Sequence, residues 1–218
     1  MTAPVTIDDI AALEAERQAL PWFPASQTQL AALNTTADQT LFGGSAGGGK
    51  SDLLVGYALL KSKDALLLRR EFKQLSAIQD RVTEIMGGKN CYRASDQLWS
   101  FPDGRRLELG SCPNLGDEAK YQGKPHDALL IDEGAHFMGD QIEFLTAWLR
   151  SADGRPCRLI VASNPPLGGQ SAGLWMVEWF KPWLDPNYPR PAKPGELRWF
   201  ARGDDGVMGE VPKGTAGA

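Results

Sequence analysis

Cysteine and histidine are scarce in this sequence, and basic residues are not in excess. The three cysteines, Cys91, Cys112 and Cys157, lie far apart without a CxxC or Cys/His spacing, and there are only two histidines in 218 residues. A disulfide framework and a zinc site are therefore not expected. Because the formal net charge is -4, the protein has no overall basic field, and any binding of nucleic acid must use a local patch.

Long apolar runs are also missing. No segment reaches the roughly 18 apolar residues of a membrane-spanning helix, and the start MTAPVTIDDI lacks the cationic region of a secretion signal. We therefore expect a protein that neither spans a membrane nor is exported. A length of 218 residues with 42% hydrophobic content predicts one large α/β domain with a buried core.

Short apolar runs alternate with segments of helical spacing through most of the chain. The runs have the length of buried parallel strands and are residues 38–42, 65–68, 127–131 and 158–162. The helical segments between them are residues 52–62, 71–86 and 141–150. Alternation of this kind predicts a mainly parallel sheet covered by helices on both faces. Residues 91–112 differ, since short alternating segments and polar turns predict a small antiparallel addition to the sheet.

Three regions are expected along the chain. Residues 1–36 hold two N-terminal helices, the first over residues 7–19, and a segment that would lie beside a bound base. The α/β core covers residues 37–203. Residues 204–218 have little to bury and are expected to form a flexible tail or linker.

The run GGSAGGGKS at residues 43–51 contains the phosphate-loop pattern G-x-x-x-x-G-K-[ST] between an expected strand and an expected helix. Glycines allow successive backbone N–H groups to surround an anionic oxygen, and the helix N-terminus adds partial positive charge. The predicted nucleotide-binding residues of the loop are Gly44, Ser45, Ala46, Gly47, Gly48, Gly49, Lys50 and Ser51. Within this set, Lys50 would neutralise the β- and γ-phosphates and the Ser51 hydroxyl would bind Mg²⁺.

Two carboxylates follow the apolar run at residues 127–131. Asp132 would lie near the phosphate loop, because the carboxyl ends of parallel strands meet at one edge, and would bind the Mg²⁺ ion directly or through water. Glu133 would orient or deprotonate the attacking water, which distinguishes an ATPase from a protein that only binds nucleotide. At the end of the next apolar run, Asn164 would contact the γ-phosphate or this water. Asn164 could instead form an Asx turn before two prolines.

These residues, taken together, resemble the ATPase domain of the large terminase subunit, the motor that packages DNA into tailed-phage capsids. The resemblance lies in PASQTQLAAL, LFGGSAGGGKSDLLVGYAL, LLLRREFKQL, YQGKPHDALLIDEGAHF, SNPP and KPWLDPNYPRPAKPGELRW, which cover most of residues 24–200. It implies a P-loop NTPase fold of the additional-strand, catalytic-glutamate type.

The resemblance also implies roles for single residues. Gln27 matches the glutamine that contacts adenine in the family, with Gln29 as the alternative. Glu133 matches the catalytic glutamate, and Ser163-Asn164 matches the motif that couples hydrolysis to motion.

The sequence departs from the family in two respects. Many relatives carry an arginine in the phosphate loop or just before a glycine that corresponds to Gly123, whereas this chain has Ala46 and Gln122 there. The basic residues left as candidates for this role are Arg69, Arg70, Arg150 and Lys124, or an arginine from a neighbouring subunit. The family also continues into a nuclease domain, whereas this sequence ends at Ala218, so we expect no DNA cleavage by this chain.

The expected function is Mg²⁺-dependent ATP hydrolysis that drives double-stranded DNA into a procapsid, without sequence preference. The resemblance implies a homo-oligomeric ring, a portal protein and a small terminase subunit as partners, and the cytoplasm of an infected bacterium rather than the mature virion as the location. Lys61, Lys63, Arg105 and Arg106 are possible DNA contacts. The alternatives are another P-loop nucleic-acid motor of helicase or recombination type, and an assembly module that binds nucleotide with negligible hydrolysis.

Overall fold

A computed structural model describes residues 20–44, 47–166, 172–203 and 208–215 of the protein. The chain divides into two compact units, Met1–Trp175 and Met176–Ala218, whereas the sequence suggested boundaries after residues 36 and 203. The helix expected over residues 7–19 lies outside the described residues. Among the described residues, no helix combines the length and apolar character needed to cross a membrane.

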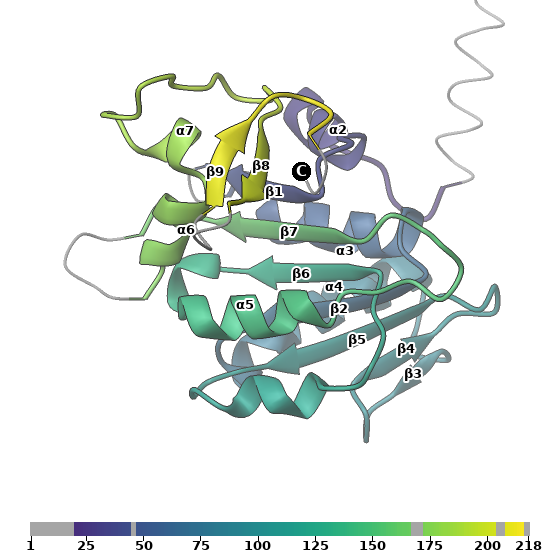
Figure 1. The fold of residues 1–218 in the computed structure, drawn as a ribbon. Coiled ribbons are helices and arrows are strands. Elements are labelled where there is room, and N and C mark those ends of the chain that lie inside the picture. Colours follow the sequence, from purple (N-terminus) through teal and green to yellow (C-terminus); the bar gives the residue numbers. More distant parts are fainter. Residues whose placement is uncertain (1–19, 45–46, 167–171, 204–207, 216–218) are drawn as a thin grey trace, which may run out of the picture. The chain divides into compact units, whose positions relative to one another are not determined.

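The first unit is built on a sheet whose seven described strands follow the order β1-β7-β6-β2-β5-β4-β3 (Figure 1). The strands are β1 (Gln39–Gly43), β2 (Asp64–Arg69), β3 (Tyr92–Arg93), β4 (Leu98–Ser100), β5 (Arg106–Ser111), β6 (Ala128–Asp132) and β7 (Arg158–Ser163). The neighbouring strands β1, β7, β6, β2 and β5 are all parallel to one another. Strand β4 pairs antiparallel with both β5 and β3. This arrangement confirms the predicted fold class.

The central strands are continuous apolar runs because helices cover both faces of the sheet. Every residue of β6 is buried, as are the four inner residues of β2. Figure 1 shows α3 (Lys50–Leu60) and α4 (Ser76–Met86) on one face and α5 (Gly139–Ala147) on the other. The core includes Leu54, Leu67, Leu130 and Trp99, each fully buried or nearly so.

Strand β7 lies between β1, which leads into the phosphate loop, and β6, which ends at Asp132. A strand inserted at this place defines the additional-strand type of P-loop fold expected above. Strand β5 differs from the expectation for residues 91–112, since it runs parallel to β2 and is antiparallel only to β4. The antiparallel addition is therefore the β3–β4 hairpin, which returns the chain so that β5 runs in the direction of β2.

The segment before the sheet packs against α3. The Trp22 ring lies directly over Gly56, where a Cβ atom would overlap the indole, and Trp22 Nε1 donates to Asp52 Oδ2 at 2.9 Å. Arg81 of α4 binds the other oxygen of the same carboxylate at 2.7 Å. The helix α2 (Gln27–Leu33) then begins after Ser26, whose hydroxyl accepts from the Gln29 N–H at 3.2 Å.

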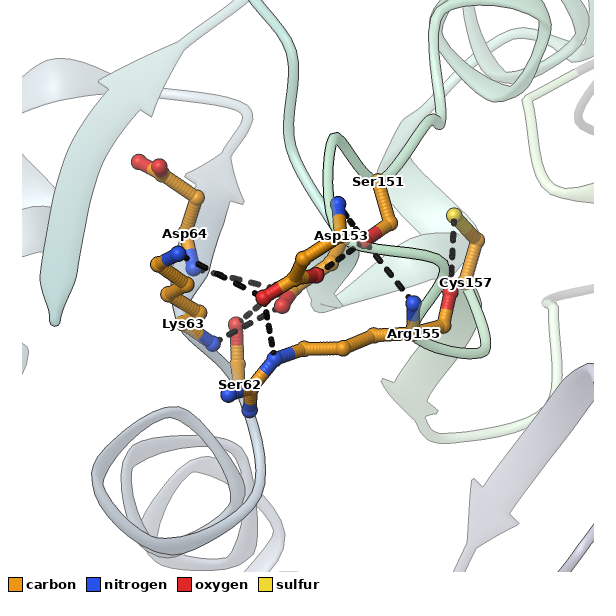
Figure 2. A network of polar contacts seen from close by, with 8 residues as sticks. Ser62, Lys63, Asp64, Ser151, Asp153, Arg155 and Cys157 are labelled. Carbon is orange, nitrogen blue, oxygen red and sulfur yellow. Dashed lines mark hydrogen bonds and ion pairs between the residues drawn. The ribbon is translucent and has the colours of Figure 1, made fainter.

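At the amino ends of the parallel strands, opposite the phosphate loop, Asp127 accepts hydrogen bonds from three successive residues. They are the Ser62 hydroxyl, the Lys63 N–H at 2.8 Å and the Asp64 N–H at 3.1 Å. Figure 2 labels the three donor residues Ser62, Lys63 and Asp64, and it shows Asp153 paired with Lys63 and Arg155. A buried carboxylate that receives three donors stabilises the entry into β2 and has a structural role.

The second unit, described by itself, contains a hairpin of β8 (Trp199–Arg202) and β9 (Met208–Val211). The helix α6 (Leu174–Trp179) crosses the division between the units, and α7 (Lys181–Leu184) follows it. Glu210 of β9 accepts from Tyr188 at 2.8 Å and pairs with Arg198 at 2.8 Å. Residues 208–211 were expected in a flexible tail, but these side-chain contacts and the pairing with β8 make them a strand.

Candidate nucleotide-binding site

The phosphate loop leaves β1 at Gly43 and enters α3 at Lys50. Gly47 and Gly49 have φ angles of 78° and 68°, which side chains disfavour, so glycine is required for this turn. Lys50 Nζ donates to the Gly44 carbonyl at 3.1 Å. The lysine side chain therefore extends back toward the start of the loop that is predicted to bind the phosphates. Residues 45–46, two of the predicted nucleotide contacts, lie outside the described residues.

Strand β6 brings Asp132 to the first turn of α3. The Ser51 hydroxyl donates to Asp132 Oδ2 at 2.8 Å, across 81 residues of sequence. Asp132 is fully buried, and its other oxygen, Oδ1, has no hydrogen-bond partner among the described residues. The structure thus places together the two side chains that the sequence predicted for a metal ion.

Glu133 follows directly and has an unusual backbone. Its φ of 56° puts it in the left-handed region, where Gln97 is the other non-glycine residue in the described part of the chain. Its side chain is half-buried, and no hydrogen bond or ion pair of its carboxylate is found within the described ranges. Backbone strain of this kind is typical of functional positions, and here it turns the chain sharply after Asp132.

Ser163 at the end of β7 fixes the turn that follows Glu133. Its hydroxyl accepts from the Ala135 N–H at 2.9 Å and donates to the Asn164 carbonyl at 2.7 Å. Ser163 is buried, whereas Asn164 is exposed. The resemblance pointed to Ser163 and Asn164 together and Asn164 was the predicted γ-phosphate contact, whereas the contact between the ends of β7 and β6 is made by Ser163.

The two candidate glutamines of α2 have different surroundings. Gln27 is exposed in the first turn of α2. Gln29 is 2% exposed, donates through Nε2 to the Gly49 carbonyl at 2.9 Å, and accepts from the Ala25 N–H at 2.6 Å. Gln29 therefore contacts the phosphate loop itself, and both ends of its amide are engaged.

Four basic residues of this chain are candidates to stabilise charge on the transferred phosphoryl group. Three of them bind partners outside the phosphate loop. Arg70 donates to the buried Gln141 at 2.7 Å, and Lys124 donates to Glu108 at 2.8 Å. Arg150 donates to a backbone carbonyl of the β5–β6 connection at 2.9 Å. The fourth, Arg69, lies in the site, where its Nε donates to Asp132 Oδ2 at 2.7 Å.

A magnesium ion would fit these residues only together with a nucleotide. In the described part of the chain, no three His, Cys, Asp or Glu side chains are placed to hold a metal. Ser51 and Asp132 nevertheless offer the oxygen donors that Mg²⁺ prefers, and the unpartnered Asp132 Oδ1 is a buried acceptor. Because Mg²⁺ keeps several waters and takes phosphate oxygens, two protein ligands are sufficient.

The strand order, with β7 between β1 and β6, and the loop between β1 and α3 define a P-loop fold of the additional-strand type. Among solved structures, the large terminase ATPase domain of Thermus phage P74-26 matches with a TM-score of 0.53 and 15% identity, over 86% of this chain and 78% of that chain. A mutant of that domain also has a TM-score of 0.53, with 17% identity over 82% and 75% of the two chains.

The large terminase of bacteriophage HK97 matches with a TM-score of 0.52 and 14% identity, over 73% of this chain. This chain covers 36% of the HK97 protein. No protein-family model and no curated protein matches the sequence. The chain has the fold of phage large terminase ATPase domains, and at these identities the likeness concerns the fold.

Proposed function

We propose that this chain hydrolyses ATP with Mg²⁺ and is the motor domain of a phage DNA-packaging terminase. The observation that carries the proposal is the hydrogen bond from Ser51 to Asp132, which joins the phosphate loop to the carboxylate after β6. A phosphate loop alone would support only binding. The adjacent Glu133, half-buried and in a strained conformation, supplies a base at the same edge of the sheet.

Each residue has a defined task in this proposal. Backbone N–H groups of residues 44–51 bind the phosphates, and Lys50 releases the Gly44 carbonyl to bind β- and γ-phosphate oxygens. Bound Mg²⁺, held by Ser51 and Asp132, would supply charge neutralisation on those oxygens. Glu133 orients a water toward the γ-phosphorus and accepts its proton as the bond to the β,γ-bridging oxygen breaks.

Two further contacts belong to the proposal. Asn164 contacts the γ-phosphate or the attacking water. The Ser163 hydroxyl bonds both the Asn164 carbonyl and the Ala135 N–H, so it would transmit a movement of Asn164 to the turn after Glu133. Gln27 contacts adenine with its exposed amide, and Gln29 is the alternative.

The fold likeness supports the rest of the proposed context. Copies of the chain form a ring that translocates double-stranded DNA, together with a portal protein and a small terminase subunit, in the cytoplasm of an infected bacterium. A ring would also allow a neighbouring copy to supply an arginine to each site, since Ala46 and Gln122 stand at the expected arginine positions.

The test is steady-state phosphate release with Mg-ATP over a range of protein concentrations. Glu133→Gln should lower turnover by about 10² to 10⁴-fold while ATP still binds, because only proton transfer is lost. Glu84→Gln, at an exposed glutamate of α4, is the matched control and should leave turnover unchanged.

The dependence on concentration separates the alternatives. Turnover per molecule that rises with concentration and is lost in Glu133→Gln supports a site completed by a neighbouring copy. Constant but Glu133-dependent turnover indicates that a basic residue of the same chain completes the site. Turnover equal to that of the variant at every concentration would contradict hydrolysis by this chain and favour the nucleotide-binding assembly module.

A further inference from the structure

Asp132 carries a buried charge that is neutralised in an unexpected way. The side chain is fully buried, and both hydrogen bonds to it converge on Oδ2, from Ser51 Oγ at 2.8 Å and from Arg69 Nε at 2.7 Å. A buried carboxylate without a counter-ion is strongly unfavourable. Arg69 therefore supplies a positive charge to the carboxylate proposed to bind Mg²⁺.

The strand order explains why Arg69 reaches this carboxylate. Strands β2 and β6 are neighbours, paired as Leu68 with Ile131, so the residues that follow this pair lie side by side at the carboxyl edge. The Arg69 side chain is 17% exposed. A second hydrogen bond joins its Nη1 to the Gln74 carbonyl of the 3₁₀ helix Phe72–Leu75 at 3.1 Å.

A divalent cation and a guanidinium cannot both neutralise one buried carboxylate without repelling each other. Mg²⁺ at Ser51 and Asp132 would bring two positive charges to a carboxylate that already pairs with one. Because Arg69 is partly exposed and has a second partner in the Gln74 carbonyl, its Nε bond can be given up without unpairing the side chain.

We propose that Arg69 is an exchangeable counter-ion of Asp132, which Mg²⁺ replaces when nucleotide binds. Arg69 neutralises the buried Asp132 carboxylate until the metal binds, and it then gives way to the metal. The proposal rests on the proposed function, since it requires that Mg-nucleotide binds at this site. It predicts that Arg69 and Mg²⁺ compete, so each weakens the hold of the other on Asp132.

The experiment compares Arg69→Ala with Arg70→Ala, the neighbouring arginine that binds Gln141 instead of Asp132. Binding of a fluorescent ADP analogue is measured at a series of free Mg²⁺ concentrations, and thermal unfolding is measured with and without Mg-ADP. In Arg69→Ala the free Mg²⁺ concentration for half-maximal binding should fall about threefold or more, because the competitor is gone.

Thermal unfolding gives an independent readout. Without Mg-ADP, Arg69→Ala should lower the Tm by roughly 5 °C or more, because Asp132 loses its counter-ion, and Mg-ADP should restore at least half of this loss. Arg70→Ala should lower the Tm equally in both conditions and leave the Mg²⁺ dependence unchanged.

Arg69→Lys provides the same test if Arg69→Ala does not fold. It keeps a positive charge but cannot reproduce the guanidinium contact, so its half-maximal Mg²⁺ concentration should lie below that of the wild type. A Mg²⁺ dependence identical to the wild type in the Arg69 variants, or a loss of Tm that Mg-ADP does not reduce, would overturn the exchange. If the wild-type protein binds no ADP analogue at any Mg²⁺ concentration, the proposed function fails as well, which is a distinct result.

Discussion

Gln29 and Gln27 lie two residues apart, yet only one of them contacts the phosphate loop. Gln29 binds the carbonyl of Gly49, the residue that precedes α3, and a Cβ atom at Gly49 would overlap its amide. The sequence alone could not separate the two glutamines, because both stand on the same short helix. Their burial separates them, since a buried amide with both ends bound has a positional role whereas an exposed amide is open to a base.

These positions predict different losses of affinity. Gln29→Ala should weaken binding of both ATP and tripolyphosphate, by roughly tenfold, because the phosphate loop loses a support and a buried carbonyl loses its donor. Gln27→Ala should weaken ATP and leave tripolyphosphate unchanged, because tripolyphosphate has no base. Calorimetric titration of the two ligands into each variant measures both. Equal behaviour of the two variants toward tripolyphosphate would contradict the assignment.

At the scale of elements, the packing of β5 against the segment before β6 depends on one glycine. Gly110 faces Tyr121, and a Cβ atom there would overlap the phenol oxygen. The ring cannot simply move away, because its hydroxyl accepts from the Ser111 N–H at 2.9 Å. Gly110→Ala should therefore lower the free energy of unfolding by about 2 kcal/mol.

Urea denaturation followed by circular dichroism measures this loss. Gly209→Ala is the matched control, because Gly209 also lies in a strand but has open space where its Cβ would stand. The control should change the free energy of unfolding by less than about 0.5 kcal/mol. A loss at Gly209 as large as that at Gly110 would show that backbone freedom, rather than overlap with Tyr121, is responsible.

Glu108 gives β5 a predicted dependence on pH. Burial of Glu108 raises the pKa of its carboxyl, but hydrogen bonds from His126 and Lys124 outweigh burial and leave the pKa below its ordinary value. A carboxyl with a lowered folded-state pKa adds stability above its unfolded-state pKa, and this stability is lost as the pH falls through the folded-state pKa.

Glu108→Gln should accordingly lower the free energy of unfolding at pH 7, and the difference from the wild type should shrink below about pH 4.5. Urea denaturation at pH 7, 4.5 and 3 measures the profile. Glu84→Gln, which removes an exposed glutamate, serves as the charge control. The interpretation of Glu108 is wrong if its variant and the control show the same dependence on pH.

The elements also differ in how far their sequence predicts them. Strands β2, β6 and β7 were expected within one residue of their ends, because a strand buried on both faces is a continuous apolar run. Strand β9, with the sequence MGEV, has no such run, and it depends on pairing with β8 and on the contacts of Glu210. The contact between Ser51 and Asp132 could be predicted, because the carboxyl ends of β1 and β6 lie at the same edge of the sheet. The contact between Arg69 and Asp132 could not, because it depends on β2 and β6 being neighbours.

At the scale of the whole molecule, the possible DNA contacts named from the sequence all have polar partners. Lys61 binds Asn34, and Lys63 pairs with Asp153, as Figure 2 shows for the latter. Arg105 and Arg106 pair with acids at the same amino-terminal edge of the sheet. Carboxylates thus offset the charge of Lys63, Arg105 and Arg106, whereas the Asn34 amide leaves the charge of Lys61 in place.

We expect duplex DNA to bind without sequence preference and mainly through phosphate contacts. Affinity for AT-rich and GC-rich duplexes of equal length should agree within about threefold, and both should fall by roughly tenfold or more from about 50 to about 200 mM salt. Fluorescence anisotropy with Glu133→Gln and Mg-ATP measures this in a state that does not turn over. A strong preference for one duplex, or an affinity independent of salt, would contradict a packaging motor.

The order of the sheet has a consequence for synthesis of the protein on the ribosome. In the part of the chain that the structure describes, β1 is the outermost strand of the sheet and pairs with β7, which lies more than a hundred residues further along the chain. The phosphate loop emerges early, directly after β1, but the strand that pairs with β1 in the described sheet is complete only once Ser163 has been translated. The edge of the sheet that carries the phosphate loop is therefore completed only when β7, the last strand along the chain in the described sheet, inserts between β1 and β6.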